Sequence, residues 1–368
     1  MCYQTIIRPH KGANSLQHND NTAKMASQDQ ILHDIGRDGK PKPWAEHRTE
    51  TDYMQAALME INPQRAVKMA SCGTWLEFAR NADGITLHDA NFCRVRLCPL
   101  CQWRRSLKIW SQTSDLVAAA NNPTPQGWIM LTLTQRNVDD YMLKAELDRL
   151  YRAWHDLTHR KEVRKAVLGW MRTLEVSHNT IEGDTAYDTY HPHFHALLQV
   201  RPSYFTSRDY IPHHKWAQLW RECMDLDYTP SVEVHRVKGD TAGAIAEVSK
   251  YATKPSSILT LDRWDLTIRT VERLDTDLSG RRLIAYGGTL RKLHNQLHLD
   301  DTETGDLIHT STDDPTAREV QDYISYRWAI GYKLYIKASE RKGAMPDEDK
   351  AQRSAARRTK AHQSGTIK

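Results

Sequence analysis

The 368 residues suffice for one large domain or two smaller ones, and 51 Lys and Arg against 46 Asp and Glu permit nucleic-acid binding without requiring it. No run of 18 apolar residues occurs and the polar N-terminus lacks a secretory pattern, so we expect neither a membrane span nor secretion. Six cysteines in such a chain do not indicate a disulfide framework, and we expect a reducing cytoplasm.

Four central stretches are predicted to be strands, because they are rich in β-branched and large apolar residues. They are 128–135, 169–177, 193–200 and 231–237. The stretch 193–200 alternates less cleanly than the others, which suits a central strand that is covered on both faces.

Helical patterns separate these strands, since apolar residues recur at three- and four-residue steps. The predicted helices are 143–157, 216–226, 241–253 and 317–336. Strands mixed with long helices indicate an α+β fold, in which helices cover an antiparallel central sheet.

A group of four cysteines precedes the first of these strands: Cys72, Cys93, Cys98 and Cys101. Four thiolates complete a tetrahedral zinc site, and the two-residue spacing of the last pair lets one turn present two sulfurs. The alternatives are a redox pair at the last two positions, unrelated buried cysteines, or His88 in place of one thiolate.

Basic side chains are frequent in the same stretch, and a basic zinc-binding module is suited to binding DNA. We expect DNA contacts from Arg104, Arg105 and Lys108. Cys223 lies on an apolar helical face and is expected in the core.

The second cluster of candidate ligands is His191-Pro192-His193-Phe194-His195. Side chains alternate along a strand, so His193 and His195 project from one face while Phe194 points into the core. Glu175, in a neighbouring predicted strand, can supply an oxygen ligand. Nitrogen and carboxylate donors together suit Mn²⁺ or Mg²⁺ as well as Zn²⁺.

The predicted helix 241–253 carries an acid, a phenol and an amine on one face. Glu247 and Tyr251 are four residues apart, and Lys254 follows three residues later. By itself this pattern also fits a solvated ion pair beside a half-buried tyrosine.

Several of these stretches together resemble the plasmid rolling-circle replication initiators of the single-tyrosine Rep family, within the His-hydrophobic-His (HUH) endonuclease superfamily. The matching segments are FCRVRLCPLCQWRRS (92–106), MLTLTQRN (130–137), MRTLEVSHN (171–179), HPHFHALLQV (191–200), EVSKYATKP (247–255) and the weaker AYGGTLRKL (285–293). They follow the family's order and cover roughly residues 68 to 295, but not the tails.

The resemblance implies roles for individual residues. It assigns the binding of the divalent ion, Mg²⁺ or Mn²⁺, to His193 and His195, and the role of nucleophile to Tyr251. Glu247 inherits the activation of water at termination. Lys250 and Lys254 are candidate cations for lowering the pKa of the phenol, and Lys250 is also a candidate DNA contact.

The implied reaction is nicking of one strand at a plasmid origin, which leaves a 5′-phosphotyrosine and a 3′-OH primer, followed by rejoining at termination. The expected substrate is single-stranded or cruciform origin DNA. Since the sequence contains no GxxxxGK[ST] loop, a host helicase and a DNA polymerase are the expected partners.

The expected organisation then has five parts: a disordered N-terminal region (1–60), a zinc-binding module (65–115), an HUH nicking and joining domain (120–300), a helical extension (301–337) and a basic disordered tail (338–368). Rival readings are an HUH transposase or relaxase, a non-enzymatic zinc-dependent DNA-binding regulator, and a metal hydrolase for small phosphoesters.

Overall fold

The chain forms two compact units in the computed structural model, which describes residues 30–36, 38–82, 84–239, 241–250, 253–309 and 320–342. The larger unit comprises the described residues among 43–73 and 92–309. The smaller unit comprises the described residues among 30–42, 74–91 and 320–342.

The larger unit is built on a five-stranded sheet in the order β6-β3-β5-β4-β7, and every neighbouring pair is antiparallel. The strands are β3 (Gly127–Leu133), β4 (Val167–Asn179), β5 (Thr189–Val200), β6 (Val232–Val237) and β7 (Ile284–Gly287). The four predicted strands are therefore confirmed, and the stretch 193–200 does lie in the central strand.

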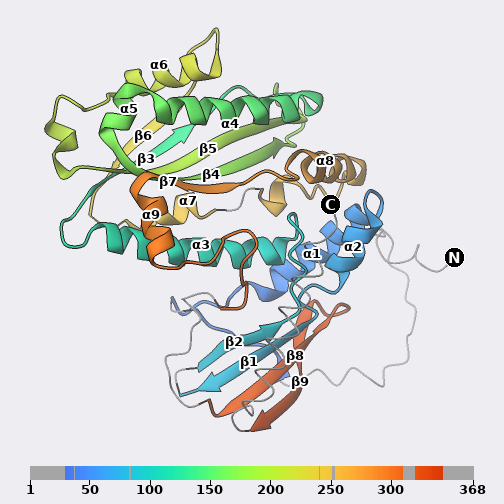
Figure 1. Ribbon diagram of the computed structural model, residues 1–368. Coiled ribbons are helices and arrows are strands. Elements are labelled where there is room, and N and C mark those ends of the chain that lie inside the picture. The colour runs from blue at the N-terminus through green and yellow to red at the C-terminus, as the bar shows by residue number, and fades with distance from the viewer. Residues whose placement is uncertain are drawn as a thin grey trace. The chain divides into compact units, whose positions relative to one another are not determined.

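Helices cover both faces of this sheet (Figure 1). On one face lie α4 (Leu143–His159) and α6 (His213–Met224), and Phe194 of β5 packs edge-on against Trp154 of α4. On the other face lie α3 (Pro99–Ala120), α7 (Ala242–Val248) and α9 (Gly288–Gln296), which share a buried apolar cluster with Leu197 of β5. Alternation along β5 thus separates its two sets of side chains.

The larger unit also holds α1 (Trp44–Met59), α2 (Pro63–Ala70), α5 (Lys161–Ala166), α8 (Trp264–Asp277) and short 3₁₀ turns at Asp140–Met142, Pro202–Thr206 and Pro255–Ser257. The expectation of disorder through residue 60 is wrong from α1 onward, because Trp44, Met54 and Leu58 of this helix are buried. The buried face of this helix also includes Arg48 and Thr51, so composition did not reveal its burial.

A second antiparallel sheet, with the order β2-β1-β8-β9, forms the smaller unit. Its strands are β1 (Trp75–Asn81), β2 (Gly84–Ala90), β8 (Asp322–Ala329) and β9 (Leu334–Lys342). The predicted helix 317–336 is therefore wrong. Residues 322–329 of that segment form β8, which pairs with β1, a partner that no local pattern reveals, and residues 334–336 begin β9, which pairs with β8.

Two expected boundaries also change. Residues 65–115 are divided between the units, since β1 and β2 belong to the smaller one and the four cysteines to the larger. Residues 338–342, expected in a disordered tail, belong to β9. Among the described residues, no helix is long and apolar enough to cross a membrane.

Candidate metal centres

Three of the expected ion ligands meet on the face of the large sheet that α3 and α7 cover. Glu175 on β4 lies directly opposite His193 on β5, and His195 lies opposite Thr173 of β4 and Thr132 of β3. Because Glu175 and Thr173 are two residues apart on one strand, all these side chains share one face.

The donor atoms of this group, Glu175, His193 and His195, converge. The Nε2 atoms of the two histidines are 3.2 Å apart, and the Glu175 Oε2 atom lies 3.3 Å from Nε2 of His195 and 3.7 Å from Nε2 of His193. All three residues are at most 8% exposed. Each offers one ligand atom within 4.8 Å of the others, so the group has the donors and spacing for a divalent ion.

Oxygen atoms orient both imidazoles of the group. The Nδ1 atom of His193 lies 3.0 Å from the carbonyl oxygen of His191, and Nδ1 of His195 lies 3.2 Å from the hydroxyl of Thr132. A ring that donates from Nδ1 keeps the lone pair of Nε2 for a metal. This arrangement suits the binding of a divalent ion. Thr132 could not be predicted as a partner of His195, because strand register is not visible in a sequence.

Charged groups border the carboxylate of Glu175. The Lys254 Nζ atom lies 2.8 Å from its Oε1 atom, and Glu247 Oε1 lies 3.8 Å from Nε2 of His195. Burial raises the pKa of Glu175, but its close contacts with His193, His195 and Lys254 outweigh burial and hold this pKa well below its ordinary value. The carboxylate is therefore ionised and ready to bind a cation.

The helix that was expected to carry the nucleophile is shorter than predicted. It ends at Val248, where Ser249 bonds back to the Ile245 carbonyl, so Glu247 is in its last turn and Lys254 is beyond it. Tyr251 lies outside the described residues. The shared helical face of Glu247 and Tyr251 is therefore not supported, although Glu247 and Lys254 both border the group of Glu175, His193 and His195.

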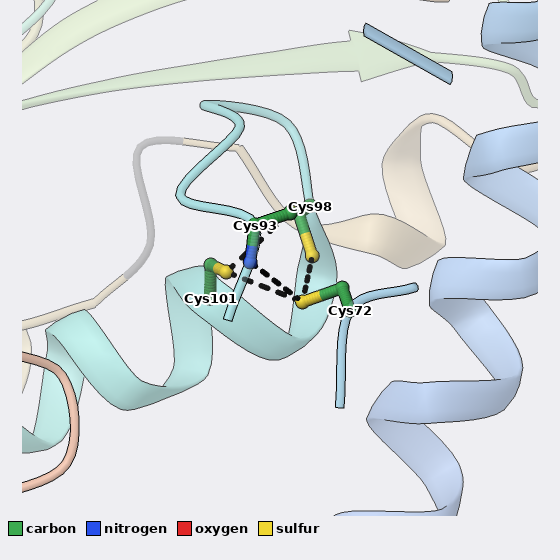
Figure 2. A group of neighbouring side chains, drawn as sticks. All are labelled: Cys72, Cys93, Cys98 and Cys101. Atoms are coloured by element: carbon green, nitrogen blue, oxygen red, sulfur yellow. Dashed lines mark hydrogen bonds between the residues drawn. The ribbon is translucent and has the colours of Figure 1, made fainter. Parts of the chain in front are cut away.

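The four cysteines form a second group, at the N-terminal end of α3 (Figure 2). Sγ of Cys72 is 3.5 Å from Sγ of Cys98 and of Cys101, and the Cys93 and Cys101 sulfurs are 3.7 Å apart. Zinc ligands with Zn–S bonds of about 2.3 Å in a tetrahedron have sulfurs about 3.8 Å apart. The spacing thus fits a zinc site and is much too long for a disulfide.

Backbone donors support these sulfurs. The N–H groups of Cys93, Arg94 and Val95 point at the sulfurs of Cys72, Cys101 and Cys93, at 3.3, 3.3 and 3.4 Å respectively. Burial raises the pKa of the Cys72 thiol, a cost that coordination to a cation reverses. N–H donors aimed at sulfur stabilise thiolates, which is the form that binds zinc.

His88 does not take the place of a cysteine. It lies on β2 in the smaller unit, where its ring packs against Tyr323 and its Nε2 atom is 3.9 Å from Glu77. The four thiols form a complete group without it.

Two basic residues that were expected to contact DNA are buried. Arg104 is 0% exposed and donates to the carbonyls of Leu307 and Ile308, and Lys108 donates to the carbonyl of Asp306 and to the carboxylate of Asp300. Their charges stabilise the segment after α9, so they are not available to DNA in this conformation.

The other two expected DNA contacts are more accessible. Arg105 is half-buried and donates to the carbonyls of Arg94 and Glu303. Lys250 is exposed and forms an ion pair with Glu247.

Several known proteins are similar to this chain. The sequence model of a family described as "Replication protein" (Rep_1) matches residues 84–336. The chain is 36% identical to a "Protein rep" of Bacillus amyloliquefaciens, over 83% of this chain and 97% of the relative. It is 35% identical to a "Protein rep" of Lactiplantibacillus plantarum, over 83% and 99% of the two chains.

A third relative, the "Protein rep" of Streptococcus pneumoniae serotype 2, is 34% identical over 79% of this chain and 90% of its own. No solved structure matches the chain significantly. The family model covers more than half of the sequence, and these relatives are covered almost end to end. The chain therefore belongs to the replication protein family, Rep_1, as its motifs led us to expect.

Proposed function

We propose that this protein initiates rolling-circle replication of a plasmid by nicking one strand of the origin. The observation that carries the proposal is the convergence of Glu175, His193 and His195, in a member of the replication protein family. Two imidazoles and a carboxylate on a rigid sheet suit Mg²⁺ or Mn²⁺ at a phosphodiester, and a DNA-binding regulator does not need such a group.

In the proposed reaction the phenol oxygen of Tyr251 attacks the scissile phosphorus. The phosphorus–O3′ bond breaks, the leaving 3′ oxygen takes up a proton, and the 5′ phosphate stays on the tyrosine. A bound Mg²⁺ or Mn²⁺ would supply Lewis-acid stabilisation of the charge that grows on the phosphate oxygens. The products are a 5′-phosphotyrosine and a 3′-OH that a polymerase extends.

Tyr251 is assigned from its place in the motif EVSKYATKP, between two lysines. Its phenol has an ordinary pKa of about 10, so a cation must help it to lose its proton. Lys254 is suited to this role, since its ammonium lies 2.8 Å from the Glu175 carboxylate and therefore beside the ion ligands.

The four cysteines are proposed to hold a structural zinc ion, because all four positions of a tetrahedron are filled by protein. Origin DNA, single-stranded or extruded as a cruciform, is the proposed substrate. A host helicase and a DNA polymerase are the proposed partners, since the sequence has no phosphate-binding loop for ATP-driven unwinding.

The test is incubation of the purified protein with Mn²⁺ and a labelled plasmid that carries its gene region, followed by denaturing electrophoresis. We expect a protein-linked 5′ end and a free 3′-OH at one position. Binding to the plasmid without a covalent product would instead favour a DNA-binding regulator and overturn the proposal.

A further inference from the structure

A basic cavity of about 200 Å³ lies in the larger unit beside the ion-ligand group. Its lining comes from the loop between Cys93 and Cys98, the first turns of α3, β4, the start of β7 with the residue before it, Lys250 after α7, and Glu303 and Thr304 after α9. On α3 the lining residues Gln102, Arg105, Ser106 and Ile109 recur at three- and four-residue steps, so a single face of the helix borders the cavity.

The rim of the cavity is positively charged. Among the described residues that line it, Arg94, Arg96, Arg105 and Lys250 are cationic and Glu303 is anionic. Glu303 is already engaged, since its Oε1 atom accepts from the backbone N–H of Leu283 at 2.6 Å and its Oε2 atom is 3.4 Å from Nη2 of Arg96. The net positive charge of the residues that line the cavity therefore favours an anionic ligand.

One guanidinium nitrogen in this rim lacks a partner. Nη1 of Arg96 is buried and finds no hydrogen-bond partner among the described residues, although Nη2 of the same side chain meets Glu303. A buried charged donor without an acceptor is costly. A phosphate oxygen is the acceptor that the planar fork of an arginine binds best.

The apolar part of the lining, its floor, comes from Ile109, Leu283 and Ile284. Hydroxyl groups of Thr173 and Ser106 lie among them. An apolar floor suits the face of a base, and a cationic rim suits its phosphate. The volume is below the range of about 300–1,000 Å³ that larger ligands occupy, so it suits a single nucleotide.

The cavity reaches the candidate ion site. Its lining residue Thr173 lies opposite His195 in the sheet and two residues from Glu175 on the same face. Its lining residue Lys250 pairs with Glu247, whose second oxygen is 3.8 Å from His195. A ligand in the cavity is thus adjacent to whatever phosphate the ion ligands hold.

We propose that this cavity binds one nucleotide of the DNA strand next to the scissile phosphate, with the base on the apolar floor and the phosphate on Arg96 and Arg105. The proposal rests on the proposed nicking function. It also gives the cysteine group a specific task. Arg94 and Arg96 lie between Cys93 and Cys98, and the Arg94 N–H donates to the Cys101 sulfur, so the cysteines position the arginine rim.

The test measures binding of single-stranded oligonucleotides that tile the plasmid region carrying the gene, with Mg²⁺ and Mn²⁺ omitted and zinc retained. Arg96→Ala should weaken the best oligonucleotide about ten- to a hundredfold, as expected for a lost charged hydrogen bond. The slope of log affinity against log salt should fall by roughly 0.7 for the lost phosphate contact. Arg152→Ala is the matched control, since it removes the same charge from an exposed site on α4, over the opposite face of the sheet.

A second variant leaves the charge intact. In the unaltered protein, replacing the bound nucleotide by an abasic one should weaken binding at a single position. Ser106→Phe fills the cavity, so it should abolish that effect. Zinc content and thermal melting identify a variant that fails to fold. If Arg96→Ala is misfolded, Ser106→Phe and the abasic scan in the unaltered protein still decide the question.

Two outcomes overturn the proposal. One is oligonucleotide binding by both variants that equals that of Arg152→Ala. The other is that both variants lose binding of a free deoxynucleoside triphosphate while they still bind the oligonucleotide as the unaltered protein does. That result would assign the cavity to a free nucleotide. Failure of the nicking proposal is distinguishable: the unaltered protein would then show the abasic effect but form no covalent adduct.

Discussion

Glu175 lies directly opposite His193 in the antiparallel register of β4 and β5, and its carboxylate also reaches His195, at 3.3 Å. Opposed residues of neighbouring strands have Cβ atoms only about 4.5–5.5 Å apart, so the backbone itself sets the spacing of these ligands. A site held by the central strands of a sheet needs little rearrangement to accept an ion. The group of candidate ligands is therefore preorganised.

Removing the two imidazoles should remove the ion. We expect His193→Ala with His195→Ala to bind Mn²⁺ at least about a hundredfold more weakly, because loss of outer partners alone costs roughly 10–100-fold. Calorimetric titration of the zinc-loaded protein measures this directly. His191→Ala is the matched control, since His191 lies on the same strand but outside the ligand group. Equal affinity in the double variant and the control would contradict the site.

The cysteine group should behave differently from the ion ligands. Cys98→Ser with Cys101→Ser is expected to lose zinc and melt at a much lower temperature, because a structural zinc contributes folding free energy directly. Elemental analysis and thermal melting measure the two effects. Cys223→Ser, at a half-buried cysteine on α6, should keep its zinc. A fully stable double variant, with no zinc in the unaltered protein either, would refute the zinc assignment.

Local sequence patterns correctly predicted the central strands and two of the helices of the larger unit. The four central strands follow from their content of β-branched and large apolar residues, and α4 and α6 follow from apolar periodicity. The shared face of His193 and His195 follows from strand alternation. The β8–β1 pairing joins Trp75 to Arg327, and such a non-local contact leaves no periodic signal in either segment. That is why β8 was mistaken for part of a helix.

The prediction of DNA contacts, which rested on charge alone, was wrong for two residues. Arg104 and Lys108 look like a basic surface in the sequence, yet each is buried against the segment 300–308. Their partners are 192 to 204 residues away in the sequence, so only the fold could reveal them. Glu247 could be associated with His195 only through the family motif, because α7 ends one residue after it.

Stability is expected to fall as the medium becomes acidic, partly through His178. Burial lowers the pKa of His178, although its ion pair with Asp188, at 3.0 Å, works in the opposite direction. The folded state therefore binds this proton less readily than the unfolded chain, whose histidine has a pKa of about 6.5. The contribution is present above that pH and is lost as the pH falls through the lower pKa of the folded state.

Replacement by an uncharged residue isolates this effect. His178→Gln should melt at a lower temperature at pH 8, because it loses its contacts with Asp188 and Thr270, but its melting temperature should change less between pH 8 and pH 5. Thermal melting at a series of pH values measures both. A pH dependence identical to that of the unaltered protein would show that His178 does not take part.

The nucleophile is tested by removing one oxygen atom. Tyr251→Phe should keep DNA binding but lose nicking and the covalent adduct, because no phenol remains to attack the phosphate. Tyr286→Phe is the control: its hydroxyl is buried, and burial raises the pKa of Tyr286 to about 12, which makes it a poor nucleophile. The labelled 5′ end is read by denaturing electrophoresis. An adduct that survives in Tyr251→Phe and disappears in Tyr286→Phe would reverse the assignment.

Glu247 is expected to serve termination rather than initiation. Its Oε1 atom is 3.8 Å from Nε2 of His195, so a water molecule that attacks the phosphotyrosine beside the ion ligands is within reach of this carboxylate. General-base catalysis contributes about 10²–10⁴-fold in rate. Glu247→Ala should therefore still nick and still form the adduct, but should release the protein from DNA at least about a hundredfold more slowly.

The competing explanation is that Glu247 only pairs with Lys250 at the surface, where both side chains are partly exposed. Exposed pairs contribute at most about 1 kcal/mol to stability, so loss of the pair alone predicts normal release. Lys250→Ala breaks the same pair and leaves the carboxylate in place, which makes it the matched control. Glu247→Tyr is sharper still, because a second phenol could replace water and close the cycle by transesterification. Both alanine variants lose the ion pair equally. Slow release in Glu247→Ala but not in Lys250→Ala therefore identifies the carboxylate as the base. Release at the unaltered rate in both variants rejects a role in termination.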